Sequence, residues 1–192
     1  MKIVERILLT DLFINKPPVL IDIGASGGIN PKWKKIAPHS ICIAFDADDR
    51  ELDISENKSG EYKKLLTINR IISIDNKEPS TFYLTNSPFG SSTLKPDKEK
   101  LKPWLFNQLF EISKTVTLPS MSIQSSLNQI GIDYIDWFKA DTQGTDLRIF
   151  SGLPTSVRNN VLAAEFEPGI IDAYDGEDKL YSVLNTMDKT EF

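Results

Sequence analysis

Histidine and cysteine are almost missing from this sequence, and with them most of the side chains that build metal cages and disulfide scaffolds. The single cysteine, Cys42, excludes an internal disulfide and a cysteine-rich zinc site. The single histidine, His39, argues against a cage of histidine ligands and leaves one candidate base for a Ser-His-Asp triad. Cys42 lies in an apolar run and His39 directly follows Pro38, so we expect a buried position for the cysteine and a surface or capping position for the histidine.

Long apolar runs and an excess of positive charge are also missing. No apolar stretch approaches the roughly 20 residues that a membrane-spanning helix needs. Residues 1–14 carry acids and lack a small-residue cleavage site, so we do not expect a secretory signal. The chain has 22 Lys and Arg against 27 Asp and Glu, a net charge of −5, which disfavours nucleic acid or an anionic membrane as the main partner. We therefore expect a cytoplasmic protein.

The composition is that of an ordinary folded protein. Hydrophobic residues make up 40% of the 192 residues and charged residues 26%, which suits one domain and excludes disordered and fibrous classes. We expect an N-terminal helix and linker over residues 1–18, with the helix in residues 1–14, and one main domain over residues 19–192.

Apolar runs and amphipathic segments alternate along the chain, which predicts an α/β fold with a Rossmann-like, doubly wound, mostly parallel sheet. The expected sheet strands are residues 19–24, 40–45, 65–74, 135–140 and 161–166. The expected helices are residues 31–37, 98–110, 122–130, 145–150 and 177–187. Residues 81–85 are expected as an extra antiparallel strand, residues 86–97 as a loop, and residues 115–118 as an extended segment.

The most informative segment is a glycine-rich turn directly after the first expected strand. It reads Asp22-Ile23-Gly24-Ala25-Ser26-Gly27-Gly28. In a doubly wound sheet, ligands bind outside the carboxyl ends of the strands, and glycine lets a ligand approach the backbone there. Asp46 follows the second expected strand, 22 residues after Gly24, which is the distance expected for a carboxylate that binds ribose hydroxyls. Together these features predict a nucleoside cofactor.

The turn also distinguishes between nucleoside cofactors. A dinucleotide fingerprint is Gly-x-Gly-x-x-Gly, but Ala25 follows Gly24, so the second glycine does not match. Asp22 would also bring negative charge near a pyrophosphate. S-Adenosylmethionine has no phosphate and carries a positively charged sulfonium, so the same residues favour a methyl donor over a dinucleotide.

Several blocks of the sequence resemble FkbM-type methyltransferases, a branch of the class I S-adenosylmethionine-dependent enzymes. The most specific block is Phe138-Lys139-Ala140-Asp141-Thr142-Gln143-Gly144-Thr145-Asp146-Leu147, which resembles the Lys-x-Asp-x-Glu/Gln-Gly-x-Glu motif of that family. The other blocks are residues 19–28, 31–33, 45–46, 75, 81–85, 91–94, 165 and 174–177. Gln143 and Asp146 stand where Glu is common, which counts against a general-base role at those two positions.

The resemblance implies transfer of a methyl group from S-adenosylmethionine to a hydroxyl oxygen, on a sugar, a glycan or a secondary metabolite. The cofactor-binding residues that we expect are Asp22, Gly24, Ala25, Ser26, Gly27, Asp46, Asp75 and Ser92. Asp141 and Glu165 are expected at the reacting centre. Alignment of the reactants supplies most of such catalysis, and a nearby carboxylate removes the hydroxyl proton. Two such acids side by side would either raise the pKa of one of them or hold a divalent cation through oxygen ligands, although we predict no specific metal site.

Three charged or polar groups have ordinary structural interpretations. Asp48, Asp49 and Glu51 are expected at the solvated start of a helix. Lys98, Lys100 and Lys102 are expected on the solvated face of a helix, beside the acceptor side, where they could meet an acidic substrate. Ser91 and Ser92 are either turn residues or part of a cofactor-binding loop.

Two other functional classes stay open at this stage. The first is a binding module that keeps the methyltransferase fold without catalysis, and the second is an NAD-dependent oxidoreductase. The family's sheet normally continues with two more strands after the last helix, and the sequence stops where the first of these would begin. We therefore expect residues 161–166 to form an exposed sheet edge, which implies either a truncated chain or an edge covered by a partner or by the N-terminal segment.

Overall fold

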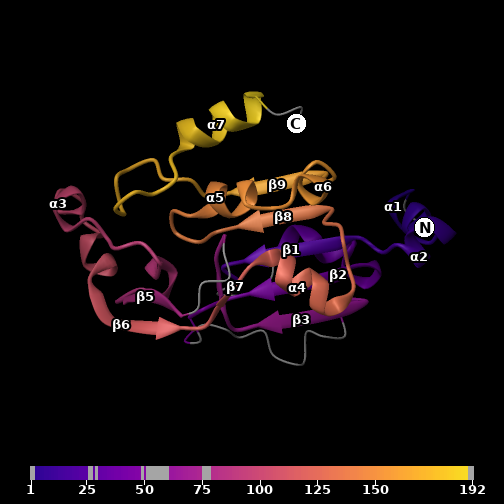
Figure 1. Ribbon diagram of the computed structural model, residues 1–192, viewed down its shortest axis with the longest axis horizontal. Helices are drawn as coiled ribbons and strands as arrows, with labels where there is room; N and C mark the ends of the chain where they lie inside the picture. Colours follow the sequence, from indigo (N-terminus) through magenta and orange to yellow (C-terminus); the bar gives the residue numbers. More distant parts are fainter. Residues whose placement is uncertain are drawn as a thin grey trace.

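The computed structural model describes residues 3–25, 28, 30–48, 50, 61–74 and 79–189. Its centre is a sheet of five parallel strands in the order β3-β2-β1-β8-β9 (Figure 1). The strands are β1 (Val19–Ile23), β2 (Ile41–Phe45), β3 (Lys64–Ile68), β8 (Trp137–Ala140) and β9 (Ala163–Phe166). The predicted α/β fold with a parallel central sheet is confirmed, and it is compatible with a Rossmann-like fold.

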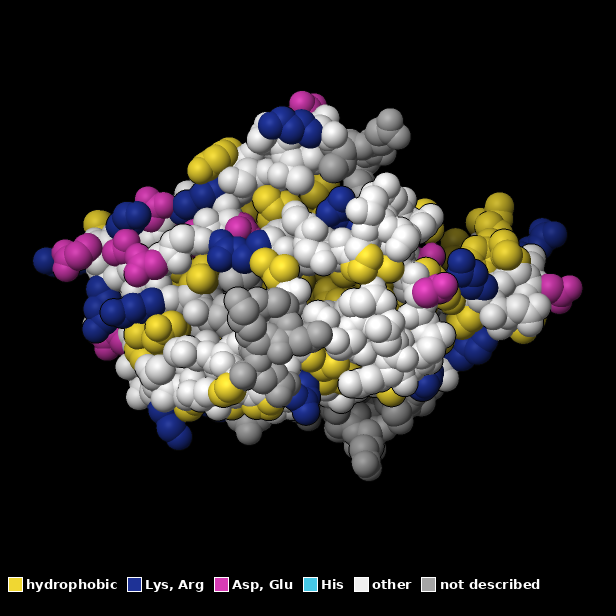
Figure 2. All heavy atoms as spheres, viewed as in Figure 1, with side chains coloured by type: hydrophobic (Ala, Val, Ile, Leu, Met, Phe, Trp, Pro, Cys, Tyr) yellow, Lys and Arg dark blue, Asp and Glu magenta, His cyan; other side chains and the backbone are white. Residues whose placement is uncertain are grey.

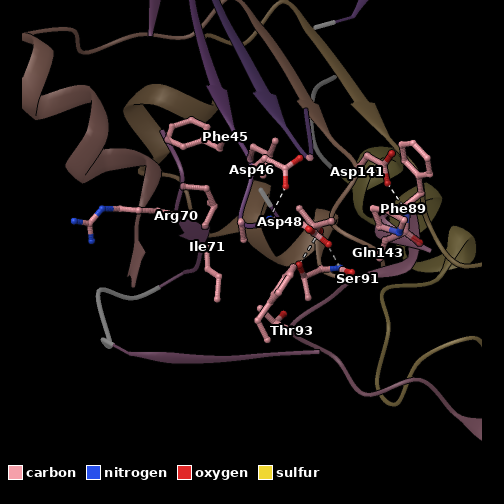
Figure 3. A pocket seen from close by; sticks show the side chains of 18 of the residues that line it. Phe45, Asp46, Asp48, Arg70, Ile71, Phe89, Ser91, Thr93, Asp141 and Gln143 are labelled. Atoms are coloured by element: carbon pink, nitrogen blue, oxygen red, sulfur yellow. Dashed lines mark hydrogen bonds between the residues drawn. The ribbon is translucent and has the colours of Figure 1, made fainter. Parts of the chain in front are cut away.

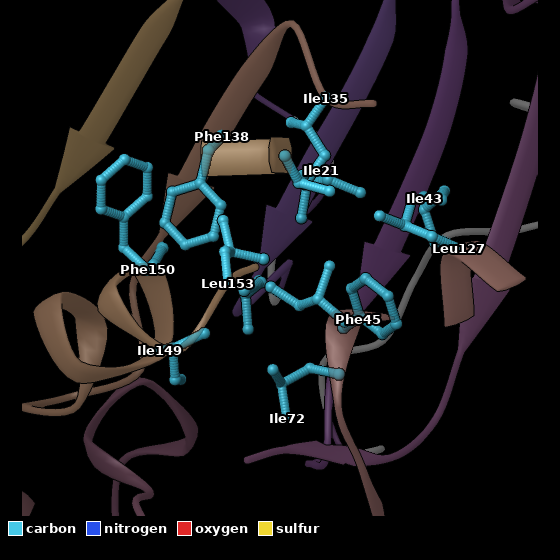
Figure 4. Close-up of a cluster of buried hydrophobic side chains, with 14 of the residues drawn as sticks. Ile21, Ile43, Phe45, Ile72, Leu127, Ile135, Phe138, Ile149, Phe150 and Leu153 are labelled. Atoms are coloured by element: carbon cyan, nitrogen blue, oxygen red, sulfur yellow. The ribbon is translucent and has the colours of Figure 1, made fainter. Parts of the chain in front are cut away.

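The two faces of the sheet are buried by different side chains, which explains why the central strands are apolar throughout. All five residues of β1 are buried. One face carries the main core, in which Ile21, Ile43 and Phe138 meet the helical residues Leu127 and Phe150 (Figure 4). The other face carries a smaller cluster around Leu20, Trp33 and Cys42. The buried position expected for Cys42 is confirmed.

Helices pack against the face of the sheet that carries the main core, and α4 is capped at both ends. The helices that flank the main core are α4 (Ile123–Ile130), α5 (Asp146–Ser151), α6 (Thr155–Arg158) and α7 (Leu180–Lys189). The Ser122 side chain accepts a hydrogen bond of 3.1 Å from the Ser125 amide at the start of α4. Gly131 ends α4 in the left-handed conformation. The short 3-10 helices η1 (Pro31–Lys35) and η2 (Ala37–His39) replace the single helix predicted over residues 31–37.

Three predicted elements are shorter or interrupted. The strand predicted over residues 65–74 is two strands, β3 and β4 (Ile71–Ile72), and β4 pairs with β7 (Ser120–Met121) instead. The helix predicted over residues 98–110 is wrong beyond its first turn: α3 (Lys98–Leu101) ends ahead of Pro103, and η6 (Asn107–Phe110) follows. The N-terminal helix is split into α1 (Ile3–Leu8) and α2 (Asp11–Asn15).

A second, two-stranded sheet lies beyond the carboxyl ends of the central strands (Figure 1). It pairs β5 (Ser80–Thr85) antiparallel to β6 (Ile112–Leu118). This confirms residues 81–85 as an extra antiparallel strand, and the extended segment is longer than the predicted residues 115–118. The short 3-10 helix η5 (Pro88–Gly90) follows β5.

Strand β9 forms one edge of the central sheet, as expected for residues 161–166. The N-terminal segment reaches the opposite edge, where Lys63 Nζ, just before β3, donates a 2.9 Å hydrogen bond to the carbonyl oxygen of Ile14. Apolar side chains gather on the surface of α1 and α2 (Figure 2), and Ile3 and Leu12 are exposed. Among the residues that the structure describes, no helix has the length and hydrophobicity needed to cross a bilayer.

Candidate functional site

A pocket of about 200 Å³ lies at the carboxyl ends of the central strands. Its walls include Gly24 after β1 and Glu167 after β9. Asp46 after β2 and Asp141 after β8 also line it and are labelled in Figure 3. The chain order reverses between the neighbouring strands β1 and β8, so the pocket lies at the topological switch point, where α/β sheets bind ligands. Apolar groups complete the lining from β4, β5 and η5, among them Ile71, Ile72, Phe82 and Phe89.

Gly24 forms the floor of the pocket, and its conformation requires glycine. Its φ is +76°, and a Cβ built on it would lie 1.9 Å from the carbonyl oxygen of Asp141. The amides of Gly24 and Ala25 both donate to the carbonyl oxygen of Phe45, at 2.9 and 3.1 Å. The glycine-rich turn therefore lies directly against the ends of β2 and β8. Ala25 is fully buried beneath it.

Asp22, near the end of β1, holds the glycine-rich turn through its contacts with Lys139 and Asn30. Its carboxylate is fully buried and pairs with Lys139 Nζ at 2.9 Å, and it accepts a 3.0 Å hydrogen bond from the Asn30 amide. Burial raises the pKa of Asp22, and the charge of Lys139 opposes that rise. Lys139 Nζ also donates to the carbonyl oxygen of Gly24 at 3.0 Å. Asp22 therefore holds the turn in place rather than lining the pocket.

The end of β2 contributes two acids with different environments. Asp46 lines the pocket, and its Oδ1 accepts a 2.8 Å hydrogen bond from the Asp48 amide. Asp48 is buried, which corrects the solvated position expected for it, whereas Asp49 and Glu51 lie outside the described residues. Arg50 donates to Asp48 Oδ1 from Nε at 2.8 Å and to Oδ2 from Nη2 at 2.5 Å. Burial raises the pKa of Asp48, but the hydrogen bonds from Arg50 and Ser91 outweigh it and hold the pKa below its ordinary value.

The loop after β5 adds two serines with different roles. Ser91 lines the pocket, and its Oγ accepts hydrogen bonds from Arg50 Nη2 at 3.0 Å and from the Thr85 amide at 3.2 Å. Ser92 lies behind this wall, fully buried, and donates to the carbonyl oxygen of Gln143 at 2.9 Å. Ser92 therefore connects the loop to the turn after β8. Three further residues predicted to bind the cofactor, Ser26, Gly27 and Asp75, lie outside the described residues.

Asp141 is a buried carboxyl group of the pocket with a strongly shifted pKa. Burial raises its pKa to about 7, and the nearby charge of Glu167 adds to the rise. Gln143 Nε2 donates a 2.7 Å hydrogen bond to Asp141 Oδ1, and Gln143 Oε1 accepts one of 3.2 Å from the Tyr174 hydroxyl. Gln143 adopts a left-handed backbone with φ of 56°, a strained conformation that the surrounding contacts maintain. The hydrogen bond from Gln143 therefore fixes the Asp141 carboxylate at Oδ1.

Glu165 does not join Asp141 at the pocket. It pairs in register with Lys139, on the face of the sheet opposite the main core, where Trp137 Nε1 donates to its Oε1 at 2.8 Å and Lys32 forms an ion pair with it. Strand β9 ends one residue later, at Phe166, and Glu167 directly after it lines the pocket together with Asp141. Glu167, rather than Glu165, is therefore the glutamate that lines the pocket beside Asp141. In the described part of the chain, no group of three or more His, Cys, Asp or Glu residues could hold a metal ion.

The position of Glu167 directly after the expected strand, residues 161–166, was the signal that could have located it, because side chains that follow parallel strands lie at the ligand edge. Side chains alternate between faces along a strand, so Glu165 and Phe166 point to opposite faces, and Phe166 packs against the main core. Glu167 follows the end of the strand, where a side chain can turn toward the ligand edge. The sequence does not show which of the two serines lines the pocket, because this depends on the contact of Ser91 with Arg50 and of Ser92 with Gln143.

The donor set of the pocket fits a cationic nucleoside better than a phosphorylated one. Asp46, Asp141 and Glu167 contribute negative charge, and Gly24 brings a backbone without a side chain to the wall of the pocket. Among the described residues that line the pocket, Arg70 is the cation, and its guanidinium points away from Asp46 and Asp141 in Figure 3. The nearby cation Lys139 is already paired with Asp22.

Compared with known protein families, curated proteins and solved structures, this chain matches none.

Proposed function

We propose that this chain is an S-adenosylmethionine-dependent methyltransferase of the class I fold that methylates a hydroxyl oxygen, as its resemblance to FkbM-type enzymes implies. One observation carries the proposal: a glycine turn at the switch point opens onto an acidic pocket, with Asp46 at the end of the second strand. The strand order β3-β2-β1-β8-β9 is consistent with the first five strands of such a sheet.

The cofactor-binding part of the proposal assigns separate tasks to three residues. S-Adenosylmethionine, when bound, supplies an electrophilic methyl group on a sulfonium that is a good leaving group. Gly24 would form the wall of the pocket beside the cofactor, and Asp46 would accept hydrogen bonds from the ribose hydroxyls. The carboxylates of Asp141 and Glu167 favour a positively charged ligand in the same cavity.

The catalytic part of the proposal rests on Asp141. A carboxyl group whose pKa is about 7 exchanges its proton near neutral pH, which suits a general base. Gln143 occupies Oδ1 of this carboxylate and so fixes its orientation. The proton of an acceptor hydroxyl would pass to Asp141, while the neighbouring Glu167 keeps the basicity of that carboxylate high. Orientation by these fixed groups contributes the larger share of the rate, as expected for a displacement reaction.

Two measurements test the proposal. Calorimetric titration with S-adenosylmethionine should show saturable binding to the wild-type chain and at least about tenfold weaker binding to Asp46→Ala, because a charge-assisted hydrogen bond is lost. Glu99→Ala, on the exposed side of α3, is the matched acidic control and should bind normally. Absence of binding by the wild-type chain would refute the proposal. Binding without methyl transfer to any hydroxyl acceptor would favour the non-catalytic module.

A further inference from the structure

A second cavity, of about 480 Å³, adjoins the pocket. We call it the apolar groove. It lies between the η6 segment and residues 167–180, and Gln143 and Glu167 line both the groove and the pocket. The two cavities therefore meet at the residues that neighbour the Asp141 carboxylate.

Apolar side chains dominate the lining of this groove. Phe106, Phe110, Ile170, Ile171, Ala173 and Leu180 contribute to it. Ile170 is 84% exposed and Leu180 is 41% exposed, so large apolar groups stay in contact with water in the free chain. Contiguous exposed apolar surface of this kind is typical of a binding site.

The wall formed by residues 167–180 is held in place before any ligand arrives. Glu177 accepts hydrogen bonds from the amides of Ala173 and Tyr174, at 3.2 and 3.0 Å, and pairs with Lys179. The Asp178 amide donates to the carbonyl oxygen of Gly144 at 2.8 Å, which ties this wall to the turn after β8. On the other wall, the Phe110 ring meets the Tyr174 ring edge-on, with centroids 5.7 Å apart. Such a preformed groove binds with little ordering cost.

The charges around the groove select against anionic ligands. Among the described residues that line it, the charged ones are Glu167 and Glu177, and both are acidic. Lys100, which the sequence placed near the acceptor side, lies close to Asp97 and Asp172 at 3.5 and 3.6 Å. A phosphate or carboxylate on the ligand would therefore meet Glu167 without a facing cation from the lining.

We infer that the apolar groove is the acceptor site, and that it takes a neutral, largely apolar alcohol or phenol rather than a sugar or an anion. The inference rests on the proposed function, since the hydroxyl would be presented to Asp141 at the junction shared by Gln143 and Glu167. The apolar body of the acceptor would cover Ile170, Leu180 and the phenylalanine rings, and its hydroxyl would point toward the pocket.

Equilibrium dialysis with 1-naphthol tests this inference without any catalysis. The wild-type chain should bind 1-naphthol saturably, and 1-naphthyl phosphate and methyl glucoside should bind at least about tenfold more weakly. Ile170→Ser should weaken 1-naphthol binding about tenfold, because it removes apolar surface that the ligand would bury. Leu162→Ser is the matched control: Leu162 is 80% exposed, precedes β9 and does not line the groove, so binding should change less than twofold.

The outcomes separate this inference from the proposed function. No saturable binding of 1-naphthol, equal losses in the two variants, or equally tight binding of the phosphate or the glucoside would overturn the inference. If S-adenosylmethionine fails to bind while the 1-naphthol pattern holds, methyl transfer is refuted and the groove stands as a site for a neutral apolar ligand. If S-adenosylmethionine binds and 1-naphthol does not, the proposed function survives and the apolar acceptor is rejected.

Discussion

Replacing Gly24 by alanine would perturb the floor of the pocket and the β1–β8 pairing at once. The new Cβ would lie 1.9 Å from the Asp141 carbonyl oxygen, which is a backbone atom and cannot rotate away. The φ of +76° adds a separate cost for any residue with a side chain. The conformational cost is about 1 kcal/mol and the cost of overpacking is about 1–3 kcal/mol. We expect Gly24→Ala to lower the free energy of unfolding by about 2–4 kcal/mol, a large share of the roughly 5–15 kcal/mol typical of a domain.

Gly131→Ala is the matched control for this experiment. Gly131 has nearly the same φ, +70°, but nothing lies within 4 Å of a Cβ built there. This variant carries only the conformational cost, so it should lower the free energy of unfolding by about 1 kcal/mol. Urea denaturation followed by circular dichroism measures both values. If Gly24→Ala proves no more destabilising than Gly131→Ala, the close approach of the turn to Asp141 is not a feature of the folded chain.

The remaining predictions concern Asp141, Lys139 and Ser122. Methyl transfer should rise as the pH increases through about 7, because Asp141 must lose its proton to act as the base; full turnover by Asp141→Asn would contradict this. The folded chain also binds that proton more tightly than the unfolded chain, so stability measured by urea denaturation should fall from about pH 4 to pH 7, and Asp141→Asn should flatten this slope. Lys139→Met leaves the Asp22 carboxylate buried without its cation and should lower the free energy of unfolding, measured by urea titration, by about 3–5 kcal/mol. The double variant with Lys139→Met and Asp22→Asn should recover part of this loss. Ser122→Ala removes the cap at the start of α4 and should cost about 1 kcal/mol in the same assay; an unchanged midpoint would show that the cap contributes nothing.

Local features were predictable from the sequence because they depend on neighbouring residues. The glycine turn, the cap at Ser122 and the end of α4 at Gly131 all follow from short-range chemistry. Asp46 and Asp141 were located because an acid that directly ends a parallel strand must lie at the ligand edge.

Long-range contacts explain where the prediction failed. Asp22 is paired by Lys139, a residue more than a hundred positions away, and no local pattern shows that this lysine neutralises it. Glu165 lies inside β9, whereas Glu167 follows its last residue, and the difference depends on where the strand ends and on its pairing with β8. The break between β3 and β4 falls at Asn69 and Arg70, which interrupt the apolar residues of 65–74. Asn69 donates to the Asp46 carbonyl oxygen at 3.0 Å, a long-range contact that the sequence does not show.

The position of β1 between β2 and β8 has a consequence for how the chain folds. The Val19 amide bonds to Asp136 across a separation of 117 residues, so the central pairing must close a very long loop before its contacts stabilise it. Pairings of this kind slow folding. The pocket has walls on both sides of this pairing, so a refolding chain acquires ligand binding together with the β1–β8 contact and not earlier. A bound ligand should therefore slow the unfolding of the chain. The same ligand added during refolding should leave the folding rate nearly unchanged.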